Sequence, residues 1–163
     1  MPKGLQCMCG ILPCDTDFAE GPTAMPHKPN LIDFHRSSSG GVRILLADDF
    51  APWRSELLSF LQSKTEWKII SEACNGLEAV QKTVELHPDV VLLDISMPGL
   101  NGIEAARRIR RLSPDCKIII LTQDADEDLM SAALEAGALA YVLKAEIATK
   151  LIPAIQAVLR PRC

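Results

Sequence analysis

From residue 42 onward, short apolar runs alternate with stretches that repeat at the period of a helix, and this alternation limits the possible folds most strongly. The apolar runs of strand length are residues 42–47, 67–73, 90–94, 117–122 and 140–144. After each run, apolar residues recur every three or four positions, which predicts amphipathic helices. Strands that are apolar throughout need cover on both faces, so the sequence predicts an α/β protein with five parallel strands and five helices.

Turn and capping residues indicate where the helices begin and end. Pro52 suits a first helical turn, and Asn75-Gly76 turns the chain into the second helix. The third helix is predicted over residues 103–112, the fourth over 126–136 and the last around 147–158. Gly137 is expected to end the fourth helix in a left-handed conformation.

The first 41 residues differ from the rest of the chain. They contain five prolines and end in Ser37-Ser38-Ser39-Gly40-Gly41, without an apolar period of either kind. This composition favours a disordered extension and a flexible linker. We therefore expect one folded domain over residues 42–159 and a short tail at 160–163.

Composition narrows the class of protein. The chain has 17 Lys and Arg against 21 Asp and Glu, a net charge of -4, which argues against non-specific nucleic-acid binding. Its apolar runs are much shorter than the ~20 residues that cross a bilayer, and its N-terminus does not resemble a signal peptide. A soluble cytoplasmic protein without membrane contact is expected.

The cysteines do not form a recognisable framework. Cys7, Cys9 and Cys14 cluster near the start, while the other three are scattered. A metal site with His27 or His35 is conceivable, but zinc sites usually use two matched Cys-x2-4-Cys pairs. Unpaired thiols are the favoured interpretation.

Polar side chains follow four of the predicted strands at the point where each ends: Asp48, Asp49, Asp94, Thr122 and Lys144. In a parallel sheet these ends meet at one edge, where ligands bind. Converging carboxylates raise a pKa or recruit a hard divalent cation, and Mg2+ is usual where phosphate is handled. An ammonium and a hydroxyl beside it would complement a phosphoryl group, with Asp94 as nucleophile. Taken singly, each Asp could instead cap a helix, Thr122 could be a strand-end hydroxyl and Lys144 a solvated strand end.

The order and spacing of these motifs resemble a two-component response-regulator receiver domain of the NarL/FixJ/LuxR type, over about residues 42–159. The resemblance rests on 46-LADD-49, 91-VLLDISMPGLNG-102, 119-IILT-122 and 137-GALAYVLK-144. It implies a flavodoxin-like, doubly wound sheet of strand order 2-1-3-4-5.

The resemblance also implies residue roles. Asp94 would be the phosphoacceptor, and Mg2+ would be held by Asp49 directly, by Asp48 mainly through water, by Asp94 and by the backbone carbonyl of Ser96. Thr122 would be the switch hydroxyl, Lys144 the cation that pairs with the phosphoryl group, and Tyr141 the aromatic residue whose rotamer follows Thr122. The donor would be a phosphohistidine on a sensor histidine kinase or a histidine phosphotransfer protein.

Two positions depart from many receivers. Gln123 follows Thr122 where a small residue is common, so a long side chain is expected to hinder access to the phosphoryl group. Ala145 follows Lys144 where Pro is common, although receivers of the LuxR type often lack that Pro.

Three functions fit the residues. The first is a stand-alone receiver that signals through an unknown output protein, using the face of the fourth helix, fifth strand and fifth helix, and that could dimerise on phosphorylation. The second is a phosphate relay or sink that exchanges phosphoryl groups with a histidine. The third, a haloacid-dehalogenase-type phosphohydrolase, lacks its Asp-x-Asp signature at the first strand.

DNA binding by the chain itself is not expected. LuxR-type regulators carry a helix-turn-helix domain after the receiver, whereas this sequence ends just past the last predicted helix. The basic cluster of Arg107, Arg108, Arg110 and Arg111 and the acidic cluster of Asp124, Asp126, Glu127 and Asp128 are interpreted as solvated helix surfaces matched to helix dipoles.

Overall fold

The computed structural model describes residues 41–63 and 66–160, and these ranges contain a doubly wound α/β domain. The strands are β1 (Val42–Ala47), β2 (Trp67–Ala73), β3 (Val90–Asp94), β4 (Lys117–Thr122) and β5 (Ala140–Leu143). The helices are α1 (Ala51–Gln62), α2 (Gly76–Leu86), α3 (Gly102–Leu112), α4 (Glu127–Glu135) and α5 (Ile147–Leu159), with a short 3-10 helix η1 (Lys144–Glu146) before α5. The predictions for residues 1–40 and 161–163, including those for Cys7, Cys9 and Cys14, lie outside the described ranges.

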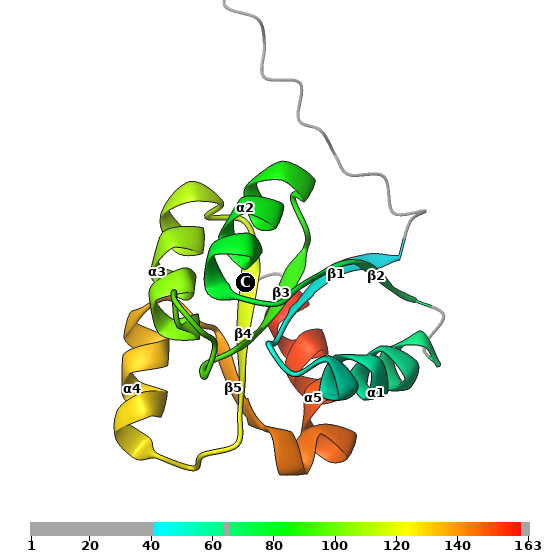
Figure 1. Cartoon of the computed structure of the whole chain (residues 1–163). Helices are drawn as coiled ribbons and strands as arrows, with labels where there is room; N and C mark the ends of the chain where they lie inside the picture. The colour runs from blue at the N-terminus through cyan, green and yellow to red at the C-terminus, as the bar shows by residue number, and fades with distance from the viewer. Residues whose placement is uncertain (1–40, 64–65, 161–163) are drawn as a thin grey trace, which may run out of the picture. The chain divides into compact units, whose positions relative to one another are not determined.

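All neighbouring strands run parallel, in the order β2-β1-β3-β4-β5. The predicted α/β class and the order 2-1-3-4-5 are therefore confirmed. The connections wind one way from β1 to β2 and the other way from β3 onward, so β1 and β3 lie side by side where the order reverses (Figure 1). Ligand sites in such sheets form beyond the carboxyl ends of the strands at this reversal.

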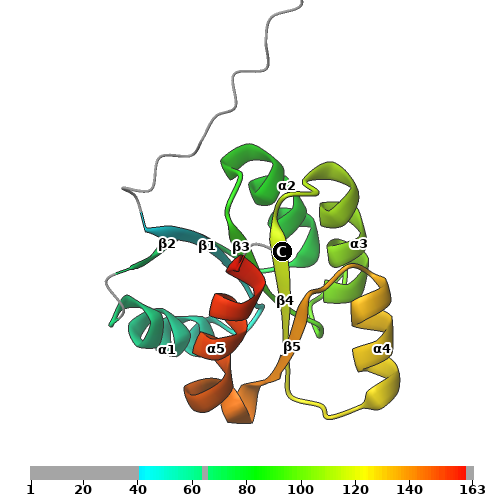
Figure 2. The same cartoon turned by 180° about the vertical axis from the view of Figure 1, so that it is seen from behind.

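The sheet is covered on both faces, which explains its continuously apolar strands. Helices α1 and α5 lie on one face and α2, α3 and α4 on the other, as Figures 1 and 2 show from opposite sides. Successive strand residues point to opposite faces. On β1, Ile44 and Leu46 join the core under α1 and α5, whereas Leu45 and Ala47 join the core under α2, α3 and α4.

The fifth strand is one residue shorter than predicted. β5 pairs with β4 up to the partners Thr122 and Leu143, and β4 ends there. Lys144 therefore has no strand partner and begins η1 instead of closing the strand.

A capping residue precedes the fourth helix, and a glycine follows it. Asp126, predicted inside the helix, is its N-cap and accepts hydrogen bonds from the N–H groups of Asp128 and Leu129. Gly137, predicted to end the helix in a left-handed conformation, has φ of +103°.

The loop between β3 and α3 is fixed by a close backbone approach. The Gly102 N–H donates to the Ile95 carbonyl at 2.9 Å. A Cβ at Gly102 would lie 2.0 Å from the Asp94 carbonyl oxygen, so only glycine allows α3 to begin here. This contact anchors the loop that follows Asp94. No helix in the described ranges combines the length and apolar character needed to span a membrane.

Candidate functional site

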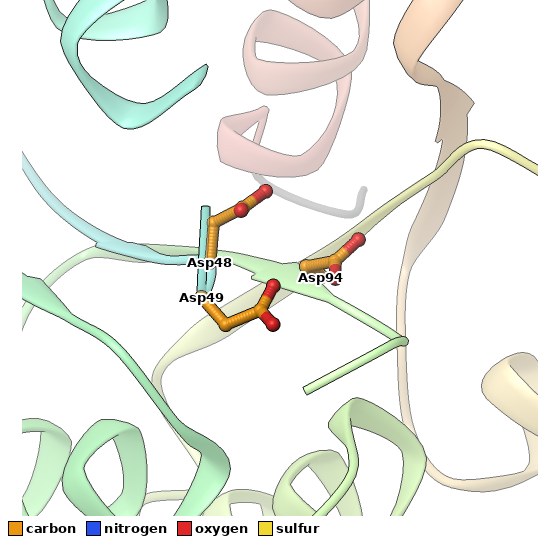
Figure 3. Close-up of side chains that lie close together, drawn as sticks. All are labelled: Asp48, Asp49 and Asp94. Atoms are coloured by element: carbon orange, nitrogen blue, oxygen red, sulfur yellow. The ribbon is translucent and has the colours of Figure 1, made fainter. Parts of the chain in front are cut away.

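Three carboxylates gather at the carboxyl edge of the sheet. Asp48 and Asp49 follow β1, and Asp94 is the last residue of β3. These two strands are neighbours, paired up to Ala47 and Leu93, so their ends lie together. One oxygen from each carboxylate lies within 4.8 Å of the others, and Figure 3 shows the three side chains close together at the adjacent strand ends.

The Lys144 ammonium joins two of these carboxylates. Its Nζ lies 2.6 Å from Asp48 Oδ2 and 2.9 Å from Asp94 Oδ1. The side chains of Asp48, Asp94 and Lys144 are 0%, 4% and 9% exposed, so the contacts are shielded from water. Three carboxylates and one ammonium leave two negative charges when all are ionised. That balance suits one divalent cation.

For both Asp94 and Lys144, burial and ion pairing shift the pKa in opposite directions. Burial raises the pKa of Asp94 above its ordinary value, although the Lys144 ammonium and the Ser96 N–H oppose the shift and the Asp48 charge adds to it. Burial alone would lower the pKa of Lys144, but its hydrogen bonds to Asp48 and Asp94 outweigh this and raise it. Lys144 is therefore a permanent cation at neutral pH.

Backbone groups fix two of the carboxylates and leave the third available. The Phe50 N–H donates to Asp48 Oδ1 at 2.9 Å, and the Ser96 N–H donates to Asp94 Oδ2 at 3.0 Å. Asp49 is exposed and makes no hydrogen bond or ion pair with another residue of the described ranges. The Asp49 carboxylate is thus the one with both oxygens open to a ligand within this part of the chain.

Thr122 and Tyr141 both bind the loop between β4 and α4. Thr122 is buried at the end of β4, and its Oγ1 accepts the Asp124 N–H at 3.2 Å. The half-buried Tyr141 donates its hydroxyl to the Asp124 carbonyl at 2.5 Å. Burial raises the pKa of Tyr141, opposed by the Thr122 hydroxyl and assisted by the charges of Asp124 and Asp126. The two side chains therefore bind the N–H and the carbonyl group of the same residue, Asp124.

The other predicted residues take surface positions. Ser96 and Gln123 are exposed beside Asp94 and Thr122. All four arginines of the basic cluster on α3 are exposed, with Arg107 paired to Glu104 at 3.0 Å. In the acidic cluster, Asp126 caps α4, and Glu127 and Asp128 occupy its first turn.

Two residues of the site were not predicted from the sequence, and both lie in the first turn of α1. Arg54 donates to the Asp48 carbonyl at 2.7 Å and pairs with Glu72 Oε2 at 3.0 Å, which fastens the end of β1 to β2. The centre of the Trp53 ring lies 5.4 Å from Lys144 Nζ. Helical periodicity carries no signal for either contact.

The family profile described as response regulator receiver domain matches residues 44–156. The chain belongs to the two-component response-regulator receiver family. The receiver is 44% identical over 116 residues to the transcriptional regulatory protein LiaR of Bacillus subtilis, covering 71% of this chain and 55% of LiaR. It is 38% identical over 118 residues to the oxygen regulatory protein NreC of Staphylococcus epidermidis, covering 72% of this chain and 54% of NreC. The receiver thus spans about half the length of these curated relatives.

Solved structures agree with this assignment. A DNA-binding response regulator of the LuxR family from Staphylococcus aureus superposes with a TM-score of 0.68 at 30% identity, covering 72% of this receiver and 98% of that chain. The CheX–CheY–BeF3–Mg2+ complex from Borrelia burgdorferi gives a TM-score of 0.69 at 26% identity, covering 74% and 90%. The predicted family and its LuxR-type character are confirmed.

Proposed function

We propose that this receiver accepts a phosphoryl group on Asp94 from a phosphohistidine, in a reaction that depends on Mg2+, and that the modification switches a protein-interaction surface. The observation that carries the proposal is the setting of Asp94. Its carboxylate is buried at the reversal of strand order, beside two further carboxylates and in contact with the Lys144 ammonium. Such a carboxylate can act as a nucleophile toward phosphorus.

The chemical step forms one bond and breaks another. An oxygen of ionised Asp94 attacks phosphorus, the P–N bond to the donor imidazole breaks, and the imidazole leaves with its electron pair and takes a proton from water. The product is an acyl phosphate. In the later hydrolysis, water attacks phosphorus, the P–O bond to Asp94 breaks, and inorganic phosphate and a carboxylate result. Lys144, whose ammonium contacts Asp94, would neutralise charge on the phosphoryl oxygens.

The donor set fits a magnesium ion. Receiver domains are generally Mg2+-dependent, and this cation prefers carboxylate and carbonyl oxygens, which this edge of the sheet supplies. Asp49 and Asp94 would bind it, Asp48 would support it mainly through water, and the Ser96 carbonyl would complete the protein ligands. When bound, Mg2+ offsets the negative charge that develops on the transferring phosphoryl group. The two uncompensated charges of the cluster support this assignment.

Thr122 and Tyr141 would transmit the change. If the Thr122 hydroxyl turns toward a phosphoryl group on Asp94, it gives up the Asp124 N–H that it now accepts. The loop that also holds the Tyr141 hydroxyl would then rearrange, and Tyr141 would follow. A new charge on Asp94 would in this way shift the loop from its present hydrogen-bonded arrangement to a second one.

Partners follow from the family. Receiver domains interact with histidine kinases and output domains. For this chain we propose a sensor histidine kinase or a histidine phosphotransfer protein as donor, an output partner of unknown identity, dimerisation on phosphorylation, and a cytoplasmic location. Gln123, exposed directly after Thr122, would restrict access to the phosphoryl group and thereby affect the lifetime of the acyl phosphate.

The test is intact-protein mass spectrometry after incubation with acetyl phosphate and Mg2+. The wild type is expected to gain one phosphoryl group, and the gain should disappear with EDTA and in Asp94→Asn. Asp115→Asn is the matched control, because Asp115 is exposed just before β4, at the other end of the strands, and should leave the gain unchanged.

A gain that persists in Asp94→Asn would refute Asp94 as the acceptor, and a gain that persists in EDTA would refute the metal requirement. If acetyl phosphate gives no gain, the same comparison is made with a phosphorylated histidine phosphotransfer protein. Failure with both donors would refute the proposed function.

A further inference from the structure

The Lys144 ammonium lies near an aromatic ring as well as near two carboxylates. Its Nζ lies 5.4 Å from the centre of the Trp53 ring, within the range in which a cation is attracted to an aromatic face. Trp53 belongs to the first turn of α1, so α1 supplies a wall to a site built otherwise from strand ends. The ammonium therefore contacts two carboxylates and one aromatic ring.

The same lysine also borders an open space. A cavity of about 180 Å³ between α1 and the start of α5 is lined by Lys144 and Trp53 together with Phe60, Ala145 and Ile147. A lysine side chain has four rotatable carbons, so its ammonium could leave the carboxylates for another position. The Trp53 ring borders this cavity and thus limits the positions to which the Lys144 ammonium could move.

The indole contributes its ring rather than its N–H group. Trp53 Nε1 is buried and donates no hydrogen bond to the protein within the described ranges. A buried donor without an acceptor costs stability, which phenylalanine or leucine would avoid. The useful interaction of Trp53 is therefore its ring face, and the charge next to that face is Lys144.

We propose that Trp53 is a positioning residue that keeps the Lys144 ammonium between Asp48 and Asp94 and thereby supports phosphoryl transfer. The role in transfer rests on the proposed function, whereas the holding of Lys144 is testable without phosphate. Replacing the ring with an aliphatic side chain should slow phosphorylation, and replacing it with a smaller aromatic side chain should largely preserve it.

The first experiment compares initial rates of phosphorylation by acetyl phosphate and Mg2+ in Trp53→Leu, Trp53→Phe and Trp67→Phe. Trp67→Phe is the matched control because it removes the same residue type from the start of β2. Loss of the cation–ring contact in Trp53→Leu should slow the reaction about 3- to 10-fold. Trp53→Phe and Trp67→Phe should stay within about twofold of wild type, because phenylalanine keeps a ring face. Urea unfolding of each variant checks that the protein is folded in the assay.

The second experiment observes Lys144 directly in the unphosphorylated protein. With 13C-labelled lysine ε-carbons, the Lys144 signal is identified as the one missing from Lys144→Met. A ring face beside the ammonium shifts its neighbouring ε-protons upfield. We expect this shift in wild type and Trp53→Phe and its loss in Trp53→Leu.

The outcomes separate the two proposals. An unchanged Lys144 signal in Trp53→Leu, or equal slowing in Trp53→Phe and Trp53→Leu, would overturn the positioning role. If wild type is not phosphorylated by any donor, the proposed function fails, and the signal alone decides whether Trp53 holds Lys144.

Discussion

Replacing Lys144 with methionine should destabilise the domain through its electrostatics. Methionine has a similar length and fills the same space, but it removes the positive charge from a site in which Asp48 and Asp94 are both buried. Both carboxylates then lose the cation that lies 2.6 and 2.9 Å away from them. The substitution therefore leaves two buried carboxyl groups without the cation that compensated their charge.

The size of the effect follows from these contacts. With an effective dielectric constant of ~20, unit charges about 4 Å apart attract by about 4 kcal/mol, so two carboxylates contribute about 8 kcal/mol before desolvation is subtracted. Removing one partner of a buried ion pair lowers the stability by about 3–5 kcal/mol in practice. We expect Lys144→Met to lower the free energy of unfolding by about 3 kcal/mol in EDTA at pH 7.

The pH dependence has a definite sign. The folded-state pKa of Asp94 is already raised by burial, and it rises further without Lys144. A carboxyl group with a raised folded-state pKa destabilises the fold fully above that pKa, and the cost disappears below its unfolded value of ~3.9. The difference between wild type and Lys144→Met should therefore shrink as the pH falls toward 4.

The assay is urea unfolding followed by circular dichroism, for the wild type, Lys144→Met, Asp94→Asn and the double variant. Since Asp94→Asn removes one of the stranded charges, Lys144→Met should cost about 1–2 kcal/mol less in that background. A Lys144→Met protein as stable as wild type at pH 7 would refute the reasoning. Strictly additive effects of the two substitutions on the free energy of unfolding would also refute it.

Three further variants test the fold around the site. Glu78 accepts the Cys74 N–H and has a pKa lowered to about 2, mainly by that bond, so its charge stabilises above pH 4.5 and the benefit is lost as the pH falls toward 2. Glu78→Gln should cost about 1 kcal/mol at pH 7, after allowance for screening of a partly exposed side chain, and almost nothing near pH 2, as measured by urea unfolding across pH; a constant difference would contradict this. Gly102→Ala places a Cβ 2.0 Å from the Asp94 carbonyl oxygen and should cost about 1–3 kcal/mol and slow phosphorylation, whereas wild-type values in both assays would count against the contact. Ile119→Ala, at a fully buried position of β4, should lower stability by about 2–5 kcal/mol in urea, and a loss below 1 kcal/mol would show that the core does not depend on it.

The sequence was most informative where a pattern repeats. Apolar runs bounded by polar residues predicted all five strands and brought Asp48, Asp49 and Asp94 to one edge, because parallel strands share their carboxyl ends. The strand order came from the family resemblance. The end of β5 was placed one residue late because β4 stops at Thr122, and pairing of this kind is not encoded in β5 itself.

Other features of the site depend on tertiary contacts that no local pattern reports. Asp48 and Asp49 are consecutive residues beyond the end of β1, yet one is fully buried and the other is exposed. The bond between Lys144 and Asp48 joins positions 96 residues apart. The roles of Trp53 and Arg54 follow from where α1 begins relative to these groups.

The central claim is that Asp94 is the residue that carries the phosphoryl group. An acyl phosphate on aspartate is reduced by borohydride to homoserine, which marks its position in a peptide. After phosphorylation with Mg2+ and reduction, peptide mass spectrometry should find homoserine at position 94 and at no other aspartate, and in no sample treated with EDTA. Homoserine at Asp48 or Asp49, or its absence after treatment with both a small phosphodonor and a phosphohistidine protein, would contradict the account.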